Sequence, residues 1–159
     1  MFHLYYTLES TAMGCHAALE EIGAPFELHP VDTVNPRPPE YLALNPNGKV
    51  PTLIDERDDG ERLMMFQSGG ILLYLADRHP EAALAPPPGS RGRRLCYQWL
   101  ALLGADFSVC DLYLHTLSRW QPTGFPAFDE FPNAARCAAL VAERPAVQRM
   151  MAVQCPEAA

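Results

Sequence analysis

The succession of a strand, a helix and a second strand at the start of the chain limits its possible folds more than any other feature. The segment FHLYY at residues 2–6 is aromatic, uncharged and apolar on both faces, which is typical of a central strand. The next segment has the apolar spacing i, i+3, i+4 and i+7 of a helix that buries one face. The residues of this stripe are Cys15, Ala18, Leu19 and Ile22. Gly23 and Pro25 then end the helix in the expected order.

The second strand is FELHPV at residues 26–31. Pro30 has no N–H group to donate to a neighbouring strand, so this strand is expected at an edge of the sheet. A strand, helix and strand of this combined length predict a right-handed crossover that joins two parallel strands.

Two further strands and two helical segments follow in the first part of the chain. Residues 35–51 are rich in turn formers and leave room for a short helical turn at PEYLAL, residues 39–44. VPTLID at 50–55 and RLMMF at 62–66 are strands joined by the polar hairpin turn ERDDGE. GGILLYLADRHP at 69–80 is a helix that ends before its proline. The order β-α-β-α-β-β-α predicts an α/β fold with a four-stranded mixed sheet.

The second part of the chain is predicted to be all helix. The proline and glycine content of APPPGSRG predicts a linker at 80–89, between a first domain at 1–79 and a helical domain at 90–159. Apolar periodicity predicts a helix at 91–103, stopped by Gly104.

Two more helices are expected beyond that point. Ser108 and Asp111 have the spacing of a capping box at a helix start. A final helical stretch is expected to start near Asn133, to be interrupted at Pro145 and to end near Met151.

Composition and charge exclude several classes of function. The formal net charge is −7, which argues against a nucleic-acid partner because phosphate binding needs a basic face. No apolar stretch approaches the roughly 20 residues that span a bilayer, and no signal peptide is expected at the N-terminus. Five cysteines stand at wide spacings and without a C-x-x-C pair: Cys15, Cys96, Cys110, Cys137 and Cys155. This pattern favours a cytoplasmic protein with reduced thiols and no metal site.

Several segments together resemble the cytosolic glutathione S-transferase family of bacterial type. NPNGKVPTLID at 45–55 and FQSGGILLYLADRHP at 66–80 resemble its glutathione-binding half, and ALEEIGAPFELHPVD at 18–32 fits the same half. DFSVCDLYL at 106–114 and ERPAVQ at 143–148 are similar to the family's later helices. The resemblance implies a thioredoxin-like, glutathione-binding N-terminal domain followed by an all-α C-terminal domain.

The chain departs from the family pattern in its helical part. Only LLGAD stands between YQWLA and DFSVCD, where family members have the rest of helix four and helix five. We therefore expect a shortened helical domain. In the family this region supplies much of the second substrate's apolar pocket and part of the dimer contact.

The resemblance assigns five residues to glutathione binding. It implies a cis bond before Pro51 and main-chain pairing of Val50 with the ligand, as when a peptide adds to a strand edge. It places Gln67 and Ser68 at the γ-glutamyl end, where a helix N-terminus attracts a carboxylate. Lys49 would pair with the glycyl carboxylate. From the residues alone, Pro51 could simply start a strand, Ser68 could be an N-cap, and Lys49 could be a solvated loop lysine.

The resemblance also implies a hydroxyl that holds the glutathione thiol as a thiolate. The candidates are Ser10 first, then Thr11, then Tyr6, near the positive end of the first helix. Ser10 could equally cap the helix. Cys15 lies on the apolar stripe and is expected in the core rather than as a nucleophile.

The resemblance thus implies an enzyme, a glutathione S-transferase that takes glutathione as co-substrate and transfers it to a small electrophile. The alternative is a non-catalytic glutathione-binding or protein-interaction module on the shortened scaffold. A thiol–disulfide oxidoreductase that uses Cys15 is a third interpretation. No nucleic-acid or membrane partner is expected, and a homodimer is a candidate assembly.

Overall fold

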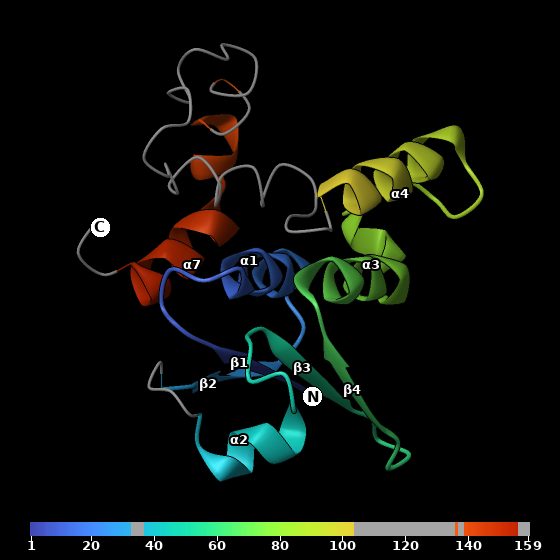
Figure 1. Cartoon of the computed structure of the whole chain (residues 1–159). Helices are drawn as coiled ribbons and strands as arrows, with labels where there is room; N and C mark the ends of the chain where they lie inside the picture. The colour runs from blue at the N-terminus through green and yellow to red at the C-terminus, as the bar shows by residue number, and fades with distance from the viewer. Residues whose placement is uncertain (33–36, 104–135, 137–138, 156–159) are drawn as a thin grey trace.

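A four-stranded mixed sheet forms the base of the computed structural model (Figure 1). The structure describes residues 1–32, 37–103, 136 and 139–155. The strands are β1 (Phe2–Tyr6), β2 (Phe26–Pro30), β3 (Thr52–Glu56) and β4 (Arg62–Phe66), in the order β2-β1-β3-β4. β1 pairs parallel with β2 and antiparallel with β3, and β3 pairs antiparallel with β4. The predicted edge position of the second strand and its parallel pairing are confirmed.

Alternation along β1 separates the two faces of the sheet. Phe2, Leu4 and Tyr6 are buried, whereas His3 and Tyr5 are only partly buried. Because successive side chains in a strand point to opposite faces, the first three residues face the core and the other two face away from it.

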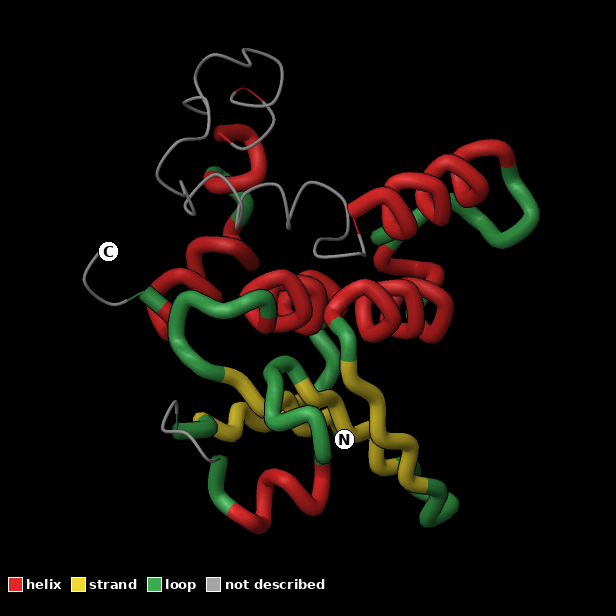
Figure 2. The backbone as a smooth tube through the Cα atoms, in the orientation of Figure 1, coloured by secondary structure: helices red, strands yellow, loops and turns green. Residues whose placement is uncertain are grey.

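Helices cover both faces of this sheet. α1 (Ala12–Ile22) and α3 (Ser68–Arg78) lie side by side on one face, and the short α2 (Pro39–Leu44) lies on the other (Figures 1 and 2). This is the thioredoxin-like arrangement expected from the order of the elements. All three helices were predicted from the sequence, to within one residue at the start of α3.

The main core lies between the sheet and the pair α1 and α3. It contains Phe2, Leu4, Cys15, Ala18, Leu19, Leu53, Ile71, Leu72 and Leu75. α1 ends as predicted, since Gly23 adopts a left-handed conformation with φ 69° and its N–H bonds to the Leu19 carbonyl at 3.0 Å. Cys15 is fully buried in this core, which confirms the structural interpretation of that residue.

The described part of the helical region comprises η1 (Pro80–Ala82), α4 (Arg91–Leu103), residues 139–142 and α7 (Pro145–Gln154). The predicted start of α4 at Arg91 is confirmed, and its predicted stop at Gly104 lies outside the described residues. The predicted interruption at Pro145 is confirmed, since residues 139–142 are helical, the helix breaks at 143–144, and Pro145 starts α7. Only the predicted end near Met151 needs correction, because α7 continues to Gln154. Proline suits a first helical turn, where its missing N–H would have no partner. The helix expected from Ser108 and the start expected near Asn133 lie outside the described residues.

α7 packs along the side of α1 (Figure 1). A second apolar cluster joins the two helices and contains Met13, Ala17, Val141, Val147, Met150 and Cys155. Two polar side-chain pairs also connect α7 to α1. The amide of Gln154 lies 3.0 Å from Nδ1 of buried His16, and Arg149 Nε donates to Glu20 Oε2 at 2.6 Å. Burial lowers the pKa of His16, and nearby Glu20 opposes that shift only in part.

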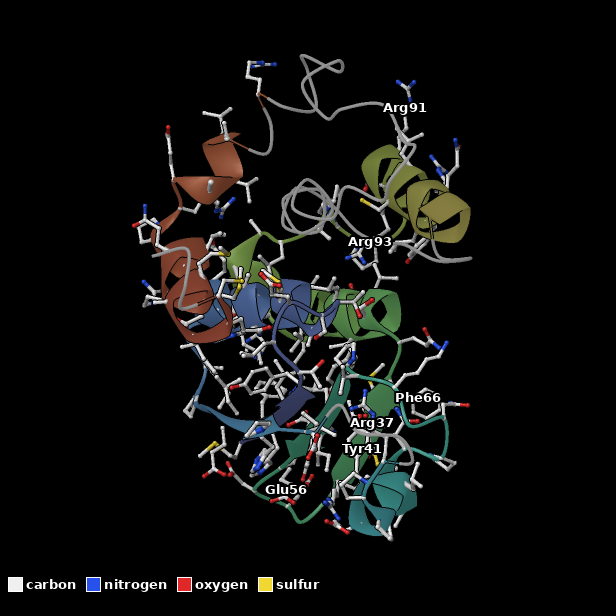
Figure 3. All side chains as sticks on the ribbon, turned by 60° about the vertical axis from the view of Figure 1, so that its left-hand side comes forward. Arg37, Tyr41, Glu56, Phe66, Arg91 and Arg93 are labelled. Carbon is white, nitrogen blue, oxygen red and sulfur yellow. The ribbon has the colours of Figure 1, made fainter. Side chains whose placement is uncertain are left out.

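α4 is tied to α3 through one buried cation. The guanidinium of Arg93 is 1% exposed, and it donates to Asp77 at 2.6 Å and to the Pro86 carbonyl at 2.8 Å. Figure 3 shows Arg93 pointing from α4 toward α3. Across the described segments, no helix is both long and apolar enough to cross a bilayer.

Candidate functional site

Three segments far apart in the sequence meet at one end of the sheet: the start of α1, the turn before β3 and the start of α3. The Thr11 hydroxyl lies 3.4 Å from the Val50 carbonyl oxygen, and the Cys15 sulfur lies 3.8 Å from the Ser68 carbonyl oxygen. The bond between Val50 and Pro51 is cis, as predicted. The fold therefore brings the predicted hydroxyl group and the predicted ligand-binding segments together.

A buried polar network holds the turn that carries Val50. The Tyr41 hydroxyl donates to the Lys49 carbonyl at 2.7 Å, and the Asn45 amide nitrogen donates to the same carbonyl at 2.8 Å. Both side chains also reach the Thr52 hydroxyl, at 2.9 and 3.1 Å. Because the Tyr41 proton goes to the Lys49 carbonyl, the Thr52 hydroxyl donates to Tyr41 and accepts from Asn45. The Lys49 carbonyl and the Thr52 hydroxyl therefore have two partners each, which fixes the backbone on both sides of Val50 and Pro51.

The sequence did not predict the roles of Tyr41 and Asn45, although the turn motif NPNG contains Asn45. The Asn45 side chain accepts a hydrogen bond from the Asn47 N–H at 3.1 Å, which is the asparagine turn that the letters NPNG favour. Gly48 follows with φ 63°, and a Cβ there would stand 3.2 Å from Leu42. The turn motif was recognisable in the sequence, but its contact with Thr52 depends on how α2 packs on the sheet.

Among the described residues, the Val50 N–H has no hydrogen-bond partner. Val50 is partly buried, and within the described ranges its carbonyl receives a single side-chain contact, the long one from Thr11. A main chain with an unpaired donor in such a position can receive an extended peptide.

The hydroxyl candidates differ in how they are engaged. Ser10 Oγ donates to the Thr7 carbonyl at 2.7 Å and accepts the Ala12 N–H at 3.3 Å, so it closes the turn into α1. Thr11 makes only its weak contact with Val50. Tyr6 is buried on the core face of β1 with 9% exposure.

The start of α3 is open to an anion. Gln67 occupies the N-cap position with no side-chain cap, and the first turn of α3 has no acidic residue. Gln67 has φ 75°, which is rare for a residue with a side chain and costs about 1–3 kcal/mol. Ser68 is the first residue of the helix, so its interpretation as the N-cap is wrong. The first N–H groups of a helix have no intrahelical partner and attract negative charge.

Cys15 lies beneath this site without the properties of a nucleophile. Complete burial raises the pKa of its thiol far above the ordinary range, so the thiol keeps its proton at neutral pH. Cys96 and Cys155 form no disulfide among the described residues, and Cys110 and Cys137 lie outside them.

Two cations stand near the turn. Lys49 is exposed, and Arg37 Nε donates to the Gly48 carbonyl at 3.0 Å. Figure 3 shows Arg37 close to Tyr41 beside α2. An anionic ligand that reaches this side of the turn would meet positive charge.

Comparison with known proteins agrees with this geometry. Residues 1–77 match the model of the glutathione S-transferase N-terminal domain. Glutathione S-transferase GST-4.5 of Xanthomonas campestris is 33% identical over 103 residues, which cover 65% of this chain and 48% of the relative. Disulfide-bond oxidoreductase YfcG of Escherichia coli is 42% identical over 64 residues, which cover 39% of this chain and 28% of the relative. The chain spans about a third to a half of the first curated relatives that it matches.

Solved structures extend the similarity to the whole fold. A glutathione transferase from Methylococcus capsulatus superposes with a TM-score of 0.81 at 25% identity, covering 97% of this chain and 98% of the other. A sphingomonad glutathione S-transferase solved with glutathione gives 0.72 at 27% identity, covering 96% and 98%. Residues 1–77 therefore form a glutathione S-transferase N-terminal domain.

Proposed function

We propose that the protein binds glutathione along Val50, stabilises its thiolate, and transfers the thiolate to a small electrophile. The observation that carries this proposal is the meeting of three groups at one place. They are the unpaired main-chain donor of Val50, the hydroxyl of Thr11 and the open N-terminus of α3. Each matches one part of the tripeptide in charge or hydrogen-bonding capacity.

The γ-glutamyl end is proposed to bind at the start of α3. Its carboxylate would accept hydrogen bonds from the first backbone N–H groups of the helix and from the Ser68 hydroxyl. The Gln67 side chain can donate to that carboxylate and accept from the α-ammonium group. The left-handed conformation of Gln67 is consistent with a position shaped by function.

The cysteinyl part is proposed to pair with the Val50 main chain next to the cis bond with Pro51, and the glycyl carboxylate with Lys49. Because Lys49 is exposed and its carbonyl is held by Tyr41 and Asn45, the backbone is fixed while the ammonium group stays free to reach a ligand. A pairing of this exposed kind is worth up to about 1 kcal/mol.

Thr11 is the proposed donor to the thiolate. Ser10 already gives its only proton to the Thr7 carbonyl, whereas Thr11 donates over a weak 3.4 Å contact that a thiolate can replace. A hydroxyl donor near the positive end of a helix lowers the pKa of a bound thiol. Ser10 is then a positioning residue that closes the turn into α1, and Tyr6 supports the strand.

The test combines calorimetry with spectral titration of the bound thiol. We expect wild type to bind glutathione, with the pKa of its thiol below that of free glutathione. Thr11→Val is nearly isosteric and should raise that thiol pKa while changing affinity less than about threefold. Ser10→Ala should lower stability by about 1 kcal/mol, through the loss of its two hydrogen bonds in the turn into α1, and leave the thiol pKa unchanged.

Three outcomes would count against parts of this proposal. Absence of glutathione binding would refute it entirely. A thiol pKa that responds to Ser10→Ala and not to Thr11→Val would move the donor to Ser10. Binding with no turnover of any model electrophile would leave the non-catalytic alternative. The oxidoreductase interpretation predicts that Cys15→Ala loses activity. We do not expect this loss, because Cys15 is buried and its thiol is protonated.

A cytoplasmic homodimer with domains at 1–79 and 90–159 completes the proposal. β4 is an edge strand on which Leu63, Met64 and Phe66 are each more than a third exposed, an apolar surface suited to a second chain. Sedimentation of wild type and of Phe66→Glu tests this assembly. The proposal predicts that wild type sediments as a dimer and that the variant sediments as a monomer.

A further inference from the structure

Two histidines and a carboxylate gather on the sheet face that carries α2, at the edge formed by β1 and β2. His3 lies on β1 directly opposite Glu27 of β2, and His29 lies two residues further along β2. One donor atom from each side chain lies within reach of the other two. The cluster is separate from the proposed glutathione site and is not used by it.

The spacing of the three donor atoms fits one tetrahedral metal ion. His3 Nδ1 is 3.1 Å from His29 Nε2 and 3.3 Å from Glu27 Oε2, and the last two atoms are 3.6 Å apart. Bonds of about 2.0–2.1 Å at tetrahedral angles put neighbouring donors about 3.3–3.4 Å apart. Octahedral coordination at the same bond lengths would place them about 3.0 Å apart. The observed triangle therefore fits tetrahedral zinc better than an octahedral ion.

The surroundings of His3 resemble the outer shell of a metal site. Its second ring nitrogen, Nε2, is buried and has no hydrogen-bond partner among the described residues. Glu56 Oε2 lies 3.5 Å from that nitrogen. Histidines that bind metals usually present their other N–H to a carboxylate, which fixes the ring and raises its basicity. A small shift of Glu56 would complete this arrangement.

The second histidine ring is also held in place. Tyr5 stacks on His29 with ring centroids 4.7 Å apart and planes 20° apart. The side chains of His3, His29 and Glu27 are 18%, 35% and 56% exposed, so an ion can enter from solvent. Three protein ligands leave the fourth position to water.

We propose that His3, Glu27 and His29 bind one zinc ion, with Glu56 as the partner of His3 and with water at the fourth position. Imidazole and carboxylate ligands suit zinc, and the two carboxylates offset its charge. The ion would join edge strand β2 to β1, so it should stabilise the edge of the sheet. The cysteine spacings indicated no metal site. They carry no information about His3, Glu27 and His29, which come together only because β1 pairs with β2.

In the metal-free protein, one of the two imidazoles donates to the other, and zinc must displace that proton. The charged groups that face the cluster are Glu27, Glu56 and, through its pairing with Glu56 at 3.2 Å, Arg62.

The experiment is a titration of chelator-treated full-length protein with Zn²⁺ by calorimetry and with Co²⁺ by absorption, both without glutathione. Wild type should bind one equivalent with tetrahedral cobalt bands and no thiolate charge-transfer band. His3→Gln and His29→Gln should each weaken binding at least about tenfold, and Glu56→Gln about tenfold. His79→Gln is the matched control, since His79 pairs with Glu81 at 2.9 Å but has no second imidazole beside it in the part of the chain that the structure describes.

Three results would overturn the proposal: zinc affinity unchanged in His29→Gln, a cobalt–thiolate band, or no binding by wild type. Zinc should also raise the melting temperature of wild type and not of His29→Gln. This second readout confirms that each variant is folded, and neither readout depends on glutathione binding or turnover.

Discussion

Removing the Tyr41 hydroxyl and the Asn45 amide together should cost more stability than the sum of the two single changes. Both groups donate to the Lys49 carbonyl, and both reach the Thr52 hydroxyl, at distances of 2.7–3.1 Å. Each single variant therefore leaves the Lys49 carbonyl and the Thr52 hydroxyl with one of these partners each. The double variant leaves the Thr52 hydroxyl, which is fully buried, without either of these partners.

The magnitudes follow from the number of lost hydrogen bonds. Tyr41→Phe loses two and should cost about 1–1.5 kcal/mol, and Asn45→Ala loses three with some packing and should cost about 2–3 kcal/mol. Leaving a buried hydroxyl unpaired adds about 1–2 kcal/mol in the double variant. In a Thr52→Val background that additional cost should disappear, because the unpaired hydroxyl no longer exists.

Urea unfolding of the four variants and of the same cycle in Thr52→Val measures the coupling. Glutathione calorimetry on the single variants shows whether the network also positions Val50, and a weaker affinity without loss of fold is expected for Asn45→Ala. Additivity within about 0.5 kcal/mol would refute the idea of redundant support. An additional cost that persists in Thr52→Val would show that another group is responsible.

Three further predictions concern single residues. Burial lowers the pKa of His16 below its ordinary 6.5. As pH falls below about 6.5, His16 is therefore protonated in the unfolded chain before it is protonated in the folded chain. The stability from neutral His16 is therefore present above about pH 6.5 and is lost as pH falls through the lowered pKa, so His16→Gln should show a weaker pH dependence in thermal melts. Cys15 should resist a thiol reagent in the folded protein and react after unfolding, which mass spectrometry of the labelled protein can follow. Gln67→Gly should keep or raise the melting temperature by relieving the left-handed conformation, yet weaken glutathione binding in calorimetry, whereas Gln67→Ala should weaken binding without the gain in stability.

The order of the elements was predictable because each one leaves a local pattern. The aromatic, uncharged composition of residues 2–6 located β1, period-3.6 spacing located α1, and Gly23 marked the end of that helix. Pro30 correctly indicated an edge strand because the missing donor has a consequence in any sheet. Pro145 correctly indicated a break in the last helical stretch, because a proline suits the first turn of a new helix and not the interior of an existing one.

The candidate site was only partly predictable. Val50, Pro51 and the start of α3 followed from the family resemblance, but the support from Tyr41 did not. That support depends on the packing of α2 against the sheet, and no local pattern reports such packing. The engagement of Ser10 with Thr7 likewise became visible only in the folded turn.

By itself, the amino-acid sequence determined the strand and helix order, the apolar face of α1 and the family to which the first 77 residues belong. These properties depend on the spacing of neighbouring residues, which the chain carries before it folds. Only the tertiary structure decided which side chains meet across long separations. Thr11 reaches Val50 and His3 meets His29 because parallel and antiparallel pairing to β1 sets their register, and register arises from the packing of the whole sheet.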